Sequence, residues 1–125
     1  EACDYIIPVP LHRRRFLARR FNQSAELARH LSALSSRPLL ASTLVRIKPT
    51  SRQVGLSARA RKENVRGAFG IASGREGDVM GKRIVLVDDV YTTGATVAAA
   101  ARRLKKVGAE DVTVLTFAMA ISGPI

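Results

Sequence analysis

The chain has 125 residues, a length that suits one compact domain with a substantial hydrophobic core. Its apolar fraction of 46% and charged fraction of 25% are ordinary for a globular protein, and its one cysteine excludes an internal disulfide and a cysteine-rich zinc site. No signal peptide is evident and no apolar run approaches about 18 residues, so we expect a cytoplasmic location without membrane insertion.

The net charge of +11 is concentrated in one half of the chain. Residues 1–67 carry 14 Lys and Arg against 4 Asp and Glu, whereas residues 68–125 carry 7 against 6. A small phosphorylated ligand would use only a few of these cations, so the excess favours a polyanionic partner such as nucleic acid. A solvated, arginine-rich surface without such a partner is the alternative interpretation.

A strand, a basic loop and a helix are expected in the first third of the chain. The chain starts at Glu1, without Met, and soon enters a strand, so we expect a fragment of a longer protein or an excised domain. The strand at residues 4–10 ends at Pro10, because proline has no N–H for a sheet ladder. A helix then runs to about Leu34, with Asn22 as a candidate N-cap. Its apolar residues recur at helical spacing and predict a core-facing stripe of Phe21, Leu27, Ala28, Leu31 and Leu34.

The middle of the chain predicts two strands separated by a long polar segment. Apolar residues at 39–41 and 43–47 predict one strand, and residues 68–71 predict the other. Residues 48–66 are rich in Arg, Lys, Ser and Gln, so we expect weak packing there, with a short helix between Ser57 and Val65. Residues 72–81 contain three glycines and predict a turn.

The stretch 84–96 gives the clearest indication of a ligand-binding site. Four apolar residues predict a buried strand at 84–87, Asp88 and Asp89 follow at its carboxyl end, and a loop rich in Thr and Gly opens onto a helix. Unpaired N–H groups at a helix start, together with the hydroxyls of Thr92, Thr93 and Thr96, predict a phosphate pocket. The two carboxylates suit sugar hydroxyls, so the stretch predicts a ribose 5-phosphate site. A metal site or a simple polar strand end is the alternative for these acids.

A helix at residues 97–107 and a further strand complete the pattern. Gly108 is expected to end the helix, and residues 112–118 predict a strand parallel to 84–87 through a right-handed crossover. The apolar side chains expected to face the sheet are Val97, Ala100, Ala101, Leu104 and Val107. The basic side chains expected to point outward are Arg102, Arg103, Lys105 and Lys106.

With its four apolar residues, two acids and T-T-G-x-T loop, the stretch 84–96 resembles the phosphoribosyl pyrophosphate (PRPP) motif of type I phosphoribosyltransferases. The resemblance implies an α/β fold, with a mostly parallel twisted sheet flanked by helices, formed by residues 1–125 as a single domain. It also implies Mg²⁺ bound through PRPP, near the two acids and not held directly by the protein. The residues implied to bind the ribose and 5-phosphate are Asp88, Asp89, Val90, Tyr91, Thr92, Thr93, Gly94, Ala95 and Thr96. Those implied to bind the pyrophosphate are Pro10, Leu11, His12 and Arg13.

In the type I fold, the position of residues 48–66 is taken by a loop that closes over the active site and excludes water. The resemblance therefore implies that this segment is a lid. We expect Arg52 and Arg59 to be its catalytic cations, which reach the pyrophosphate. Solvated side chains without a catalytic role are the alternative for both.

Three further sequence motifs indicate a particular family within the phosphoribosyltransferase-like proteins. The chain has P-V-P-L-H at 8–12, R-x-F-N-Q at 19–23, and T-x-x-Q-x-x-L followed by R-x-x-N-V-x-G-A-F between 50 and 69. These motifs resemble the ComF family (ComFC- and GntX-like proteins), whose usual R-G-F-N-Q is altered here because Arg20 replaces the glycine. The resemblance implies a role in DNA uptake during natural competence, with competence-machinery proteins as partners. The upstream zinc-binding segment of that family is not in this chain.

Two hypotheses follow for function. The favoured one is a PRPP-binding protein that handles single-stranded DNA, and the alternative is an active phosphoribosyltransferase that transfers ribose 5-phosphate from PRPP to a nitrogen nucleophile. The chain has six aromatic residues and no Trp, so we expect any single-strand binding to depend mostly on phosphate contacts. The candidate nucleic-acid contacts are Arg13, Arg14, Arg15, Arg19 and Arg20.

Overall fold

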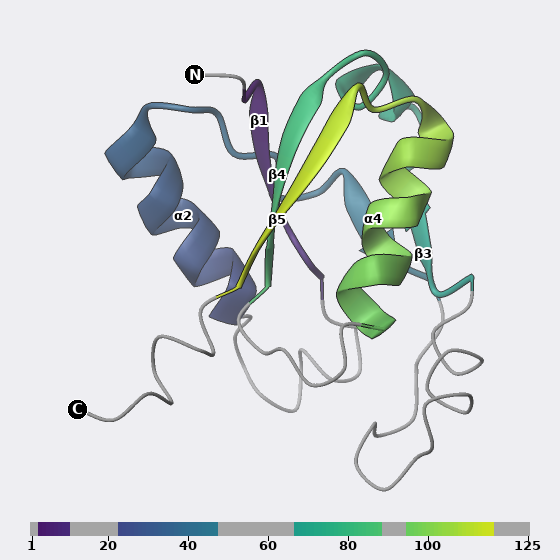
Figure 1. Ribbon diagram of the computed structural model, residues 1–125, viewed down its shortest axis with the longest axis horizontal. Coiled ribbons are helices and arrows are strands. Elements are labelled where there is room, and N and C mark those ends of the chain that lie inside the picture. The colour runs from purple at the N-terminus through teal and green to yellow at the C-terminus, as the bar shows by residue number, and fades with distance from the viewer. Residues whose placement is uncertain (1–2, 11–22, 48–66, 89–94, 117–125) are drawn as a thin grey trace, which may run out of the picture.

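The computed structural model describes residues 3–10, 23–47, 67–88 and 95–116 (Figure 1). The predicted basic loop, the polar segment with its short helix, and the tip of the phosphate loop lie outside these residues. In the described part of the chain, no helix is long and apolar enough to cross a membrane.

The centre of the fold is a parallel sheet of three strands, β1 (Tyr5–Pro8), β4 (Arg83–Asp88) and β5 (Asp111–Thr116). Their order is β1-β4-β5, which places β4 in the middle. The registers are parallel throughout, with Ile6 opposite Val85 and Val87 opposite Leu115. This arrangement confirms the expected α/β fold with a parallel sheet.

The strand expected from residues 39–47 is divided in two. Leu39 bridges Ile6 in a parallel sense on the free side of β1, and the Leu40 N–H donates to the Ile6 carbonyl at 2.9 Å. The next residues form β2 (Leu44–Arg46), which pairs antiparallel with β3 (Phe69–Ile71) in a separate sheet. The prediction of one strand here was wrong, because the two halves find different partners that local sequence does not specify.

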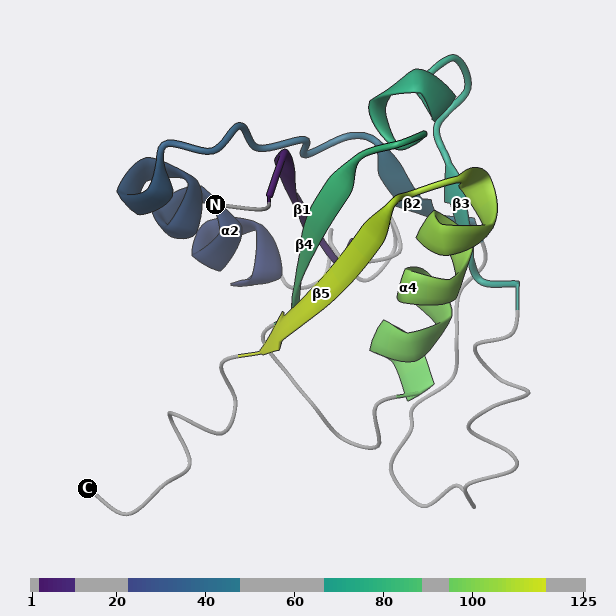
Figure 2. The same ribbon diagram turned by 45° about the horizontal axis from the view of Figure 1, so that its top comes forward.

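In the described part of the chain, one helix covers each face of the parallel sheet, as Figures 1 and 2 show. Because side chains alternate along a strand, β1 and β4 supply both layers. Ile7 and Leu86 pack in the layer that contains residues of α4 (Ala95–Val107). Ile6 and Val87 pack in the opposite layer, with Ala28 of α2 (Gln23–Ser35). The expectation of helices on both faces is therefore confirmed.

Helix α2 contacts the sheet through a narrower stripe than the sequence predicted. Ala28 is fully buried and Leu27 and Leu31 are half-buried, but Leu34 is 86% exposed. The expected core position for Leu34 was wrong, because it lies in the last turn, beyond the residues that pack on the sheet. The buried stripe instead includes Ser24, one turn before Ala28 and only 3% exposed.

Helix α4 follows its predicted pattern and ends as expected. Leu104 is fully buried, and Gly108 adopts a left-handed backbone with φ of 114°. The Gly108 N–H donates to the Lys105 carbonyl at 3.0 Å and the Ala109 N–H to the Leu104 carbonyl at 3.1 Å, which is a Schellman motif. Arg103 differs from expectation, because it is half-buried and its Nε donates to the Phe69 carbonyl at 3.0 Å.

The turn before β4 contains a short 3₁₀ helix, η1 (Glu76–Asp78). Asp78 fixes this turn, because its Oδ2 accepts hydrogen bonds from the buried Thr43 hydroxyl at 3.0 Å and from Arg75 at 3.1 Å. The final strand, β5, is confirmed, but Val114 and Leu115 are 41% and 36% exposed. The described part of the chain therefore leaves β5 more open than its apolar sequence suggests.

Candidate ribose-phosphate site

Strands β1 and β4 end, and two helices begin, at the carboxyl edge of the parallel sheet. Strands β1 and β4 run side by side and both end there, and the Val9 N–H donates to the Val87 carbonyl at 2.8 Å just beyond their last paired residues. Pro10 then leaves β1 close to the place where Asp88 ends β4. Helices α2 and α4 both begin at this edge (Figure 1). In open α/β sheets, ligands bind at this edge, outside the carboxyl ends of the strands.

Asp88 is held at the edge by a contact from across the fold. The Ser24 hydroxyl donates a hydrogen bond to Asp88 Oδ1, with an oxygen-to-oxygen distance of 3.2 Å. Ser24 is 3% exposed and Asp88 is 8% exposed, so the bond is shielded from water. A buried carboxylate needs such donors, because an unsatisfied buried charge is strongly unfavourable. The bond joins the first turn of α2 to the end of β4, 64 residues later, and thereby fixes the Asp88 carboxylate.

The N-terminus of α4 supplies the second element of the site. The helix begins at Ala95, and Thr96 is half-buried in its first turn. The first N–H groups of a helix have no partner inside the helix and carry a partial positive charge, so this end favours an anion. No acidic residue lies in the first turn of α4 to occupy that position.

The described residues include four of the predicted site residues, namely Pro10, Asp88, Ala95 and Thr96. The structure places them at one edge of the sheet, where β1 and β4 end and α4 begins. The remaining candidates lie outside the described residues: Leu11, His12, Arg13, Arg14, Arg15, Arg19, Arg20, Arg52, Arg59, Asp89, Val90, Tyr91, Thr92, Thr93 and Gly94.

Sequence reasoning gave no role to Ser24. Its signal is a polar residue in the buried stripe of α2, one turn before Ala28, where an apolar residue is the usual choice. Such a residue predicts a buried polar partner, but not which one. Among the residues described, no group of three or more His, Cys, Asp and Glu side chains is placed to hold a metal ion.

Comparison with known proteins decides the family. The sequence matches the family described as "Phosphoribosyl transferase domain" over residues 24–124. The chain belongs to this family. The match includes both Ser24 and the complete stretch 84–96.

Curated relatives confirm the resemblance to the ComF family. The chain is 39% identical to "Competence protein F" of Haemophilus influenzae over 117 residues, which are 94% of this chain and 51% of that protein. It is 42% identical to "DNA utilization protein YhgH" of Escherichia coli K12 over 111 residues, which are 89% of this chain and 47% of that protein. The chain thus spans about half the length of these relatives.

A third relative is named as an enzyme. The chain is 34% identical to "Uracil phosphoribosyltransferase" of Streptomyces coelicolor over 80 residues, which are 64% of this chain and 37% of that protein.

Solved structures support the same fold. A glutamine PRPP amidotransferase from B. subtilis, complexed with ADP and GMP, is similar with a TM-score of 0.56 and 24% identity. The similarity covers 90% of this chain and 22% of the other. The allosteric regulatory enzyme of purine biosynthesis gives a TM-score of 0.57 at the same identity, with 90% of this chain and 21% of the other covered. The type I phosphoribosyltransferase fold expected from the sequence is confirmed.

Proposed function

We propose that this domain binds PRPP at the carboxyl edge of its parallel sheet. The observation that carries the proposal is the Asp88 carboxylate, fixed by Ser24 at the end of β4, at the sheet edge where α4 also begins. A fixed hydrogen-bond acceptor at the same sheet edge as an anion-binding helix end is an arrangement that suits a sugar phosphate. The membership of the phosphoribosyl transferase domain family supports this assignment.

Each part of PRPP has a proposed partner. Asp88 and Asp89 accept hydrogen bonds from the ribose hydroxyls, and the loop 90–96 with the first N–H groups of α4 binds the 5-phosphate. The loop after β1, from Pro10 to Arg13, binds the pyrophosphate. Mg²⁺ would be carried by the pyrophosphate and ribose oxygens near the two aspartates, and would supply neutralisation of the phosphate charge.

We propose that the protein containing this domain acts in DNA uptake and handles single-stranded DNA. The names of the relatives, a competence protein and DNA utilization proteins, support the biological role. The net charge of +11 supports a polyanionic partner. The five arginines at 13–15, 19 and 20 remain the sequence-based candidates for nucleic-acid contacts, and proteins of the competence machinery remain candidate partners. The cytoplasmic location and the single-domain assignment for residues 1–125 also remain predictions.

Phosphoribosyl transfer is the second candidate function, and the uracil phosphoribosyltransferase relative favours it. In that reaction a nitrogen nucleophile forms a bond to the anomeric carbon of PRPP. The bond from that carbon to the pyrophosphate oxygen breaks, pyrophosphate leaves with the electron pair, and the nitrogen loses a proton. The protein would contribute positioning and charge stabilisation, with Arg52 and Arg59 as the proposed cations that stabilise the departing pyrophosphate.

Calorimetric titration of PRPP with Mg²⁺ tests the binding site. We expect the wild type to bind and Asp88→Asn/Asp89→Asn to lose at least about tenfold in affinity, because each carboxylate hydrogen bond contributes about 1.5–3 kcal/mol. The matched control is Asp111→Asn, which removes an exposed carboxylate at the opposite end of the sheet.

Three outcomes separate the possibilities. Full PRPP affinity in the double variant would refute the proposed role of the aspartates, provided that circular dichroism shows a folded protein. Failure of a folded wild type to bind PRPP would refute the site itself. Release of pyrophosphate in the presence of uracil or another nitrogen base would identify an enzyme.

A further inference from the structure

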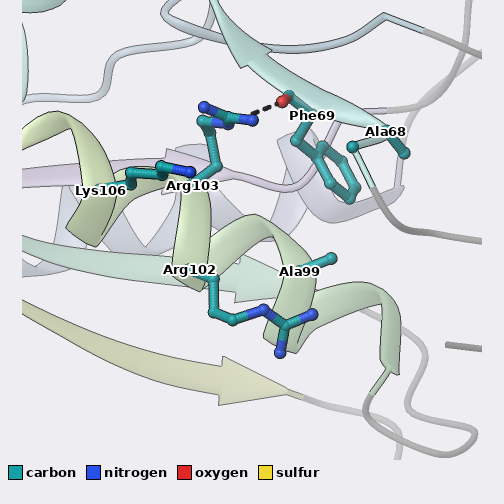
Figure 3. Close-up of a pocket in the computed structure, with 7 residues that line it drawn as sticks. Ala68, Phe69, Ala99, Arg102, Arg103 and Lys106 are labelled. Carbon is teal, nitrogen blue, oxygen red and sulfur yellow. Dashed lines mark hydrogen bonds between the residues drawn. The ribbon is translucent and has the colours of Figure 1, made fainter.

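A pocket lies on the flank of α4 that contacts β3. This pocket of about 190 Å³ is formed where α4 meets the start of β3, and Figure 3 shows its lining side chains. Its helix wall is built from Ala99, Arg102, Arg103 and Lys106, which lie on successive turns because they are spaced by three, four and seven residues. Its other wall is the segment 67–69.

The charged side chains that line this pocket are all positive. Three of its lining residues, Arg102, Arg103 and Lys106, are cationic, and none of its described lining residues is acidic. Arg103 is fixed in place, because its Nε donates to the Phe69 carbonyl at 3.0 Å. In Figure 3, Lys106 lies on the same side of the helix as Arg103, whereas Arg102 extends toward the other flank.

Arg102 and Lys106 are exposed cations one helical turn apart. Within the described part of the chain, neither makes an ion pair or a side-chain hydrogen bond. Lys106 lies in the last turn, where a cation also interacts favourably with the helix dipole. The helix dipole does not account for the position of Arg102, which lies one turn before the last turn. It also does not account for the pocket between α4 and β3.

A neighbouring depression provides a comparison. It lies between α4 and β5 and shares Arg102 and Lys106, but its lining includes the carboxylate of Asp111. A like charge in the lining disfavours an anionic ligand. The pocket beside β3 is therefore the better anion site of the two.

We infer that the pocket between α4 and β3 binds backbone phosphates of single-stranded DNA, with Arg102 and Lys106 each contacting one phosphate. Arg103 is a positioning residue, because its hydrogen bond to Phe69 joins the two walls. The inference rests on the proposed DNA-handling function and assigns part of that binding to a surface distinct from the PRPP site. Open concave cationic surfaces suit a flexible strand, which can place its phosphates without base-specific contacts.

The test is a salt series of oligo(dT) binding, followed by fluorescence anisotropy, with the 125-residue chain. The variant is Arg102→Gln/Lys106→Gln, which leaves Arg103 and its contact to Phe69 intact. We expect the slope of log affinity against log salt to fall in magnitude by about 1.4, because each single-strand phosphate contact contributes about 0.7. The affinity near 0.1 M salt should fall on the order of tenfold.

The matched control is Arg37→Gln/Arg83→Gln, which removes the same formal charge. Arg37 follows α2 and Arg83 starts β4, so both lie away from the pocket. We expect this control to change the salt slope by less than half as much as the pocket variant. Equal slopes in the two variants would show that net charge alone matters and would overturn the inference.

PRPP titration into the same variants keeps the two proposals distinguishable. We expect the pocket variant to bind PRPP with unchanged affinity while DNA binding weakens. A loss of PRPP affinity in this variant would assign the cations to PRPP and overturn the DNA contact. A wild type that binds PRPP but no oligo(dT) at low salt would refute the DNA-handling function, whereas wild-type DNA affinity in the pocket variant would refute only this surface.

Discussion

Replacing Ser24 with alanine tests the contact that fixes the candidate site. The substitution removes the hydroxyl that donates to Asp88 Oδ1 and changes little else in volume. Hydrogen bonds to charged groups contribute about 1.5–3 kcal/mol net. The oxygen-to-oxygen distance of 3.2 Å is longer than is typical for a hydroxyl donor, so the lower end of that range applies.

Helix propensity opposes this loss. Alanine is favoured over serine inside a helix by about 0.5 kcal/mol, and Ser24 lies in the first turn of α2. We therefore expect Ser24→Ala to lower the free energy of unfolding by about 1 kcal/mol. For a chain of this size, that change lowers Tm by about 4 °C.

Urea unfolding followed by circular dichroism measures the effect. Ala33→Ser at an exposed position of the same helix is the matched control, and it should destabilise by about 0.5 kcal/mol through propensity alone. A Ser24→Ala protein that is as stable as the wild type, or more stable, would refute the reasoning, because propensity would then outweigh the buried bond.

A double-mutant cycle with Asp88→Asn assigns the effect to this pair. Ser24 and Asp88 both make further interactions, so the single substitutions also report on those. We expect a coupling energy of about 1 kcal/mol between the two positions. Ser24→Ala should also weaken PRPP binding, because the Asp88 carboxylate loses a group that orients it. Zero coupling would mean that Ser24 and Asp88 act independently.

Two further predictions concern the packing of α4. Leu104→Ala, at a fully buried position, should lower the free energy of unfolding by about 2–5 kcal/mol, and a loss below about 1 kcal/mol in urea unfolding would contradict its place in the core. Gly108→Ala should destabilise by about 1–2 kcal/mol, because φ is 114° and the new Cβ would lie 3.2 Å from Met80 Cγ. Gly77→Ala is its control, since no atom lies within 4 Å of that Cβ; similar unfolding midpoints for the two variants would exclude strain at Gly108.

The sequence predicted the elements whose signals are local. The apolar run at 84–87 predicted the central strand, and the periodicity of 97–107 with Gly108 predicted α4 and its end. These patterns succeed because strand alternation, helical spacing and the left-handed glycine are properties of a few consecutive residues. The T-T-G-x-T loop also predicted the family, which the match over residues 24–124 confirms.

Predictions that depended on distant partners were less accurate. The strand expected at 39–47 was split, because Leu39 pairs with β1 while Leu44 begins a strand that pairs with β3. Leu34 fits the helical stripe but extends past the sheet, and β5 is apolar yet partly exposed. In each case the sequence predicted the local element, but the burial and pairing of its residues depend on segments far away in the chain.

The sequence by itself predicted a buried parallel strand that ends in two acids and is followed by a phosphate loop, and the structure confirms the strand up to Asp88. Only the tertiary structure decided that Ser24 meets Asp88 across 64 residues, and that segment 67–69 closes a pocket against the cations of α4. Hydrogen-bonding and apolar patterns act over a few residues and can be read along the chain. Which surfaces face each other depends instead on how the helices pack on the sheet, and that is settled by the burial of apolar side chains in the whole domain.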